Sequence, residues 1–122
     1  MFDDATPIYR QIADQIRDDV VAGRLLEGDR VMSTNECAVF HRINPATASK
    51  AFQQLVEEGV IEKRRGLGMF VTAGARERLL TDRRARFERE VVDPMVAEAS
   101  LLAIPVGEVV AMVRARAGRK DR

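Results

Sequence analysis

Cysteine, histidine, tyrosine and tryptophan are scarce in this chain of 122 residues, which has one, one, one and none of them. The single cysteine, Cys37, cannot form an internal disulfide; it fits a reducing compartment, and we expect it to be buried. One histidine and one cysteine cannot supply the three or four ligands of a zinc site. No nucleophile is paired with a base and no phosphate-binding loop is present, so we predict no enzymatic activity, no metal and no cofactor.

Long apolar runs are also missing. No segment approaches the roughly 20 apolar residues of a membrane span, and residues 1–4 lack the positive and apolar regions of a signal peptide. Hydrophobic residues make up 46% of the chain and charged residues 32%, which permits a packed core. We therefore expect a cytoplasmic protein with one ordinary domain, or a small domain and an appendage, and no membrane contact.

The balance of charge argues against a simple basic nucleic-acid binder, because the net charge is only +1. Residues 1–74 contain 9 Lys and Arg against 11 Asp and Glu, a net charge of −2. Residues 75–122 contain 11 against 8, a net charge of +3. If the first part binds DNA, its acidic residues must lie away from a local positive surface.

Two helix starts lie close together in the first part. Ser33 and Glu36 have the spacing of a capping box, in which each side chain bonds to the other residue's backbone amide. Asn44 and Pro45 form the second start, since asparagine caps a helix and proline fits its first turn. The first of these helices must therefore be short, and Gly59 ends the second. An earlier helix is predicted by apolar residues at every fourth position, Ile8, Ile12, Ile16 and Val20.

The helix that begins at Pro45 has an unusual outward surface. Its core-facing residues repeat with helical spacing and are Ala48, Ala51, Phe52, Leu55 and Val56. The other side begins with small and polar residues, where an ordinary solvated helix favours Glu, Lys and Arg; they are Ala46, Thr47, Ser49 and Lys50. We interpret this surface as one that enters the major groove of DNA and hydrogen-bonds to base edges and phosphates.

A basic turn follows between two short strand-like segments, residues 60–63 and 69–72. Most charge runs are solvated surfaces, but Arg64, Arg65 and Gly66 between two strands are typical of the wing of a DNA-binding domain. Three helices and a two-stranded wing predict a mainly α, α+β winged helix-turn-helix domain over residues 1–74.

The remaining residues, 75–122, predict a short helical tail. Pro94 either kinks one long helix or begins a new one after an Asp93 cap, and Pro105 starts a last, short helix that frays from Ala117. About 40 residues are too few to form a core alone, so the tail must pack on the first domain or on another copy. We favour a second copy, because DNA readers of this kind recognise paired half-sites. The apolar residues expected in this dimer contact are Leu80, Phe87, Val91, Met95, Leu102, Val109 and Val113.

Arginines line the other side of the tail's first helix. They could extend the DNA contact or meet a membrane surface, but interspersed acidic residues such as Glu77 and Glu88 favour a solvated, ion-paired surface. These arginines are Arg76, Arg78, Arg83, Arg84, Arg86 and Arg89.

Several spaced motifs resemble the GntR superfamily of bacterial regulators, and within it the YtrA-like subfamily. The resemblance covers residues 7–72, and the length of the tail is similar to that of the subfamily's dimerisation region. The matching motifs are Pro7-Ile8-Tyr9-Arg10-Gln11-Ile12, Ser33-x-x-Glu36-x-Ala38, Asn44-Pro45-x-Thr47-x-x-Lys50-Ala51-Phe52-x-x-Leu55 and Glu58-Gly59-Val60-Ile61-Glu62-x-Arg64-Arg65-Gly66-x-Gly68-x-Phe70-Val71.

The resemblance implies a homodimeric winged helix-turn-helix protein, usually a repressor, that binds an inverted-repeat operator in double-stranded DNA. Where the family usually has proline, arginine and leucine, this chain has Met32, Asn35 and Cys37. The loss of the arginine removes a charged DNA contact and leaves a shorter amide. Carried over by position, the DNA-contacting residues are Ser33, Asn35, Asn44, Pro45, Ala46, Thr47, Ser49 and Lys50, with Arg64, Arg65 and Gly66 in the wing.

Two questions stay open at this point. The acidic first part and Asn35 leave an alternative function, a winged-helix module that contacts proteins and has lost DNA binding. The tail is too short to enclose a sizeable pocket, so a small-molecule effector would bind between helices at the dimer contact. The sequence does not identify such an effector.

Overall fold

The computed structural model describes residues 5–120, without the side chain of Lys120. Contacts within the chain divide it into two compact units, the first ending at Thr81 and the second beginning at Asp82. The boundary lies inside a helix, α4 (Ala75–Phe87). In the part of the chain that the structure describes, no helix is long and apolar enough to cross a membrane.

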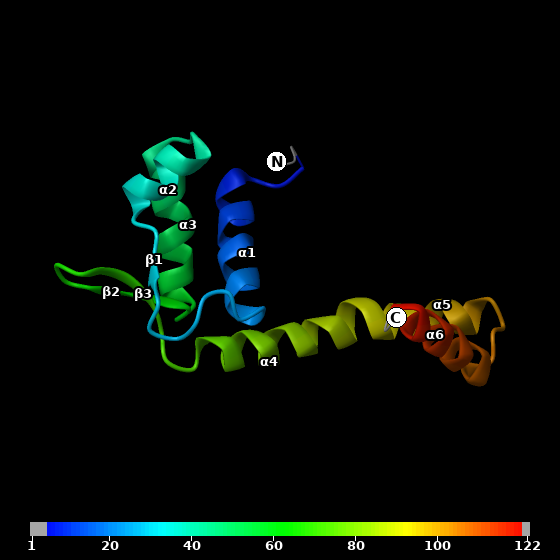
Figure 1. Cartoon of the computed structure of the whole chain (residues 1–122). Helices are drawn as coiled ribbons and strands as arrows, with labels where there is room; N and C mark the ends of the chain where they lie inside the picture. The colour runs from blue at the N-terminus through cyan, green and yellow to red at the C-terminus, as the bar shows by residue number, and fades with distance from the viewer. Residues whose placement is uncertain (1–4, 121–122) are drawn as a thin grey trace. The chain divides into compact units, whose positions relative to one another are not determined.

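The first unit combines three helices with a small antiparallel sheet, followed by the start of α4 (Figure 1). The predicted winged helix-turn-helix fold is confirmed, but the sheet has three strands and not two. The additional strand is β1, which pairs with β3, so that β3 is the middle strand between β1 and β2. The elements are α1 (Ile8–Val21), β1 (Arg30–Val31), α2 (Thr34–His41), α3 (Pro45–Glu57), β2 (Ile61–Arg64) and β3 (Gly68–Val71).

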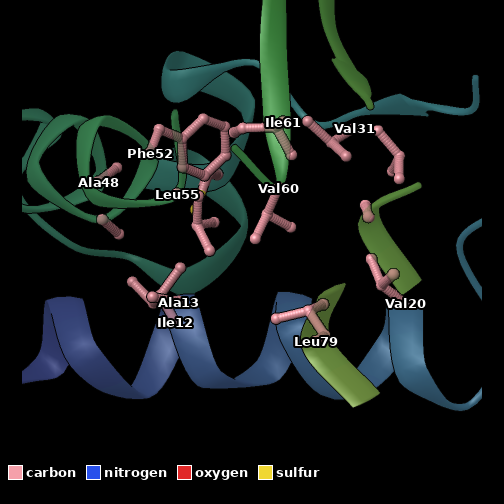
Figure 2. Packing of buried hydrophobic residues seen from close by; sticks show 14 of the residues in the cluster. Ile12, Ala13, Val20, Val31, Ala48, Phe52, Leu55, Val60, Ile61 and Leu79 are labelled. Carbon is pink, nitrogen blue, oxygen red and sulfur yellow. The ribbon is translucent and has the colours of Figure 1, made fainter. Parts of the chain in front are cut away.

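The core of the first unit lies between α1, α3, the sheet and the first turns of α4 (Figure 2). Every buried side chain in the described residues is apolar. Full burial of a large aliphatic side chain stabilises a fold by roughly 1.5–3 kcal/mol, so this cluster holds the helices in place. The largest fully buried side chains are Ile12, Leu55, Ile61, Val20 and Val71. Cys37 is buried as expected, and burial raises the pKa of its thiol.

Both predicted helix starts of the helix-turn-helix are present. The Ser33 hydroxyl accepts a bond from the Glu36 amide, and the Glu36 carboxylate accepts one from the Ser33 amide, both at 3.0 Å. The Asn44 side-chain oxygen accepts a bond from the Ala46 amide at 2.8 Å. Between the two helices, Arg42 has a φ of 55°, a left-handed conformation that closes the tight turn.

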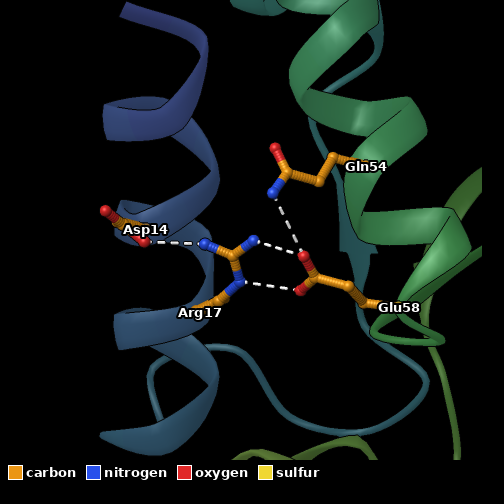
Figure 3. A network of polar contacts seen from close by, with 4 residues as sticks. All are labelled: Asp14, Arg17, Gln54 and Glu58. Carbon is orange, nitrogen blue, oxygen red and sulfur yellow. Dashed lines mark hydrogen bonds and ion pairs between the residues drawn. The ribbon is translucent and has the colours of Figure 1, made fainter. Parts of the chain in front are cut away.

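A polar network joins α1 to the end of α3 (Figure 3). Arg17 donates to both carboxylate oxygens of Glu58, at 2.9 and 2.6 Å, and to Asp14 at 2.6 Å. The Gln54 amide donates to the same Glu58 carboxylate at 3.3 Å. Burial by itself would lower the pKa of Arg17, but the bonds and charges of Glu58, and then of Asp14, raise it. These bonds fix the crossing of α1 against α3.

Two arginines tie the start of α4 to the ends of α1 and α3. The Arg76 guanidinium donates to the Val21 carbonyl at 3.0 Å, and the Arg78 guanidinium donates to the Gly59 carbonyl at 2.7 Å. Carbonyls at helix C-terminal ends lack helical partners and favour a positive charge. Both side chains are exposed, as expected of a solvated surface, but they bond to backbone carbonyls where ion pairs were expected. Leu79, on the same helix, packs into the core.

The second unit contains the rest of α4 and three further helical segments. The chain stays helical past Pro94, and the Asp93 amide donates to the Glu88 carbonyl five residues earlier. Proline has no amide hydrogen, and its ring needs the space that a carbonyl four residues earlier would occupy, so the wider turn accommodates it. Asp93 has helical backbone angles, so a new helix capped by Asp93 is ruled out. The segments are η1 (Glu88–Val92, a π-helical turn), α5 (Asp93–Leu101) and α6 (Val106–Lys120).

The helices α5 and α6 contact each other. They are joined by a turn in which Ala103 has a φ of 56° and the Ile104 amide donates to the Ala99 carbonyl. The last helix has 15 residues and continues to Lys120. The expectation of a short helix that frays from Ala117 is therefore wrong for residues 117–120. Residues 121–122 lie outside the described residues. Of the side chains described in the second unit, none is buried.

Candidate nucleic-acid interface

One side of the first half of α3 packs into the core, and the other side faces solvent. Its inward residues Ala48, Ala51 and Phe52 are 0%, 0% and 3% exposed, which anchors the helix in the core. The outward residues at its start were all predicted to contact DNA. Thr47 is half-buried and the others are exposed, namely Asn44, Pro45, Ala46, Ser49 and Lys50.

A groove lies beside this surface. It is lined by the start of α2, the outer side of α3, and the two wing strands β2 and β3. Three predicted DNA-contacting residues meet there, Ser33, Asn35 and Ser49. The residues from Asn44 to Thr47, Lys50 and the wing tip are not among its lining residues. No acidic residue lines the groove in the described part of the chain, which fits the requirement for a reading surface free of negative charge.

Three polar residues that line the same groove were not among the predicted DNA-contacting residues, namely Thr34, Gln53 and Lys63. Gln53 lies four positions after Ser49, a spacing that places two side chains on one side of a helix, so this signal was present. Lys63 belongs to the basic run before the wing tip. Its place in the groove depends on how the wing packs against α3, which no local pattern shows.

The carboxylate of Glu36, the residue next to Asn35, already has partners within the molecule. The backbone amide of Ser33, then its hydroxyl, and then Arg30 hold the pKa of Glu36 below its ordinary value. The Arg30 guanidinium lies 3.2 Å from the Glu36 carboxylate. The negative charge of Glu36 is thus paired within the capping box and with a cation.

Lys50 contacts a residue that sequence reasoning did not single out for function. Its ammonium lies 4.2 Å from the centroid of the Tyr9 ring, at the beginning of α1. An ammonium over an aromatic ring is attracted by the negative charge on the face of the ring. The side chain of Lys50 is therefore directed by α1 while it stays exposed.

Side chains at the base of the wing contact one another, whereas the tip of the wing is exposed. The Arg64 guanidinium lies 4.5 Å from the centroid of the Phe70 ring and 3.3 Å from the Glu62 carboxylate. In the turn, the Leu67 amide donates to the Arg64 carbonyl, and Gly66 has a φ of 78°, which favours glycine. Arg65 is exposed, and no hydrogen bond or ion pair to another described residue holds it.

The comparisons with known proteins agree with this geometry. The family model described as bacterial regulatory proteins, gntR family, matches residues 8–71, more than half of the chain. The HTH-type transcriptional repressor YtrA of Bacillus subtilis (strain 168) is 38% identical over 76 residues, which are 62% of this chain and 58% of that protein. The resemblance to YtrA-like regulators that the motifs indicate is thereby confirmed.

Two solved structures extend the comparison. A putative transcriptional regulator of the GntR family from Bacteroides thetaiotaomicron has a TM-score of 0.77 and 33% identity, over 93% of this chain and 98% of that one. AraR(DBD), solved in complex with operator ORX1, has a TM-score of 0.55 and 25% identity, over 59% of this chain and 93% of that one. The chain belongs to the GntR family of bacterial regulatory proteins and is a DNA-binding transcriptional regulator with a winged helix-turn-helix.

Proposed function

We propose that the protein represses transcription as a homodimer that binds an inverted-repeat operator. The start of α3, which we call the recognition helix, enters the major groove together with the start of α2. The wing tip, with Arg65 and Gly66, lies near the adjacent minor groove. The observation that carries this proposal is the groove beside α3, where hydroxyls, amides and Lys63 meet without an acidic side chain.

The relatives support the finer parts of the proposal. YtrA of Bacillus subtilis is named a repressor, and AraR(DBD) was solved on an operator. The exposed small residues Ala46 and Ser49 let the helix approach base edges closely.

The second unit supports dimerisation. An apolar groove between α5 and α6 is lined by residues that include three of those expected in the dimer contact, Met95, Val109 and Val113. Others expected there are exposed although apolar; Phe87 is 57% and Leu102 59% exposed. We assign this surface to a second copy of the chain, because an inverted repeat requires two reading units in a symmetric pair.

Binding of DNA is tested by fluorescence polarisation with promoter-derived and random duplexes at several salt concentrations. Arg65→Ala should weaken binding and reduce the slope of log affinity against log salt by about one. Arg116→Ala is the matched control, since it removes the same charge from a side chain that bonds to the Met112 carbonyl of its own helix. If Arg65→Ala and wild type bind promoter duplexes alike, the wing assignment is wrong.

Dimerisation and repression need separate measurements. Sedimentation equilibrium should give twice the chain mass for wild type and the single-chain mass for Val110→Glu. Val39→Glu is the control, because Val39 is 78% exposed in the first unit. A reporter driven by a bound promoter should be expressed more strongly when the gene for the protein is deleted. A fall in expression would show activation instead.

A further inference from the structure

The groove beside the recognition helix contains two amide side chains that have no hydrogen-bond partner among the described residues. Asn35 projects from the first turn of α2 and Gln53 from the middle of α3, and both are exposed. Neither amide forms a hydrogen bond with another described residue. Other amides near α3 are engaged, since Asn44 caps α3 and Gln54 bonds to Glu58.

We propose that Asn35 and Gln53 read adenine, so that the operator carries A·T pairs at the positions that face this groove. This inference rests on the proposed function and deepens it. An amide can donate to N7 of adenine and accept from its N6 amino group in one planar contact. Both groups must be accessible for that contact. Those of Asn35 and Gln53 are exposed and unengaged. By contrast, one group of Asn44 and one group of Gln54 already have partners.

The positions of the cations near the groove do not favour recognition of guanine there. Guanine is read mainly by arginine or lysine at its O6 and N7 atoms. No arginine lines the groove within the described part of the chain, and its one cation is Lys63, which belongs to the wing. Lys50 lies over Tyr9, and Arg64 lies over Phe70 and beside Glu62.

The apolar part of the groove fits the other base of the pair. Val56 was expected to face the core, but it is 41% exposed and lines the groove together with Phe52 and Met69. Thymine presents a methyl group in the major groove, and apolar side chains pack against it. Amides for adenine and an apolar surface for thymine occur in the same groove.

The inference is tested by selecting duplexes from a random pool with the full chain and sequencing the bound fraction. Wild type should enrich a motif in which A·T pairs occupy fixed positions of each half-site. Asn35→Ala and Gln53→Ala should each relax the preference at one of those positions by about tenfold. Asn35→Arg should shift the preference at its position from A to G. Gln54→Ala is the control, and its motif should match that of wild type.

The outcomes separate this inference from the proposed function. If wild type enriches no motif at all, the proposed function fails. If wild type enriches a motif that the Asn35 and Gln53 variants leave unchanged, or one with G·C at the positions they affect, only the assignment of adenine reading is overturned. Thermal unfolding of each variant identifies any that lose binding through misfolding, and Asn35→Ser and Gln53→Met, which also remove the amide, replace those.

Discussion

The Lys50 ammonium lies 4.2 Å from the ring centroid of Tyr9, so the first helix directs a cation of the recognition helix before any DNA is bound. A free lysine side chain carries about 2 kcal/mol of rotamer entropy. Part of that entropy is lost when the side chain is held in one place. A lysine already directed by Tyr9 loses less of it on binding a phosphate or base, which makes Tyr9 a positioning residue.

Tyr9→Ala should therefore weaken operator binding by about two- to fivefold, the range of an exposed cation–π contact of about 0.5–1 kcal/mol. Tyr9→Phe keeps the ring and should bind nearly as well as wild type. Fluorescence polarisation measures both, and Lys50→Ala combined with Tyr9→Ala should be no weaker than Lys50→Ala alone. An equal loss in the phenylalanine variant would show that the hydroxyl, and not the ring, matters.

The Arg17–Glu58 pair should contribute measurably to stability. Its side chains are 15% and 36% exposed, and the contact has two parallel bonds. We expect a coupling free energy of about 1 kcal/mol, at the upper end for partly exposed pairs. A double-mutant cycle with Arg17→Met and Glu58→Gln, followed by urea denaturation, measures it.

The matched control for that cycle is the pair Arg24–Asp19, whose side chains are 64% and 29% exposed. Because its arginine is much more exposed and a single bond joins the two groups, its coupling should be smaller. Equal couplings for the two pairs would mean that burial and the second bond add nothing to the Arg17 contact.

Glu36 should make the first unit sensitive to acid. Its pKa is lowered in the folded protein, so its charge stabilises the fold above the ordinary glutamate pKa of about 4.3. That stabilisation is lost as the pH falls through the lowered pKa. Glu36→Gln cannot change its charge, so its thermal midpoint should vary less with pH below about 5 than that of wild type. Circular dichroism at a series of pH values checks this, and an unchanged pH profile contradicts it.

Pro94→Ala should stabilise the helical run that contains it. Alanine restores an amide hydrogen at this position and removes the ring that the π-helical turn accommodates. The gain should be smaller than the roughly 3 kcal/mol that proline costs inside a regular helix, because the wide turn already relieves part of the conflict. Hydrogen exchange should show slower exchange of the amides in η1 and at the start of α5. Unchanged exchange would mean that the wide turn has another cause.

The helix starts that the structure confirms depend on short stretches of chain. The capping box of Ser33 and Glu36 and the cap at Asn44 involve bonds that span three residues or fewer. Their geometry depends on nearby backbone alone, so residue type and spacing are enough to predict them. The sequence left two alternatives at Pro94, a kinked helix or a new one, because a proline is compatible with a helix only when the turn before it widens.

The tail shows how neighbouring positions can mislead. Leu80 was expected in the dimer contact, and the structure shows it half-buried, while the adjacent Leu79 is 6% exposed in the core of the first unit. Successive residues on a helix point in directions about 100° apart, so which leucine faces inward depends on how α4 docks. The dimer role of Leu80 stays a prediction.

The sequence by itself determined the family, the winged helix-turn-helix and the places where its helices begin, because motif spacing, capping bonds and helical periodicity are local. Only the tertiary structure decided that β1 joins β3, that Lys50 meets Tyr9 and that Asn35 and Gln53 share one groove. These residues are far apart along the chain. Their contacts depend on how loops close and how helices pack around the buried core, which the order of the residues does not show locally.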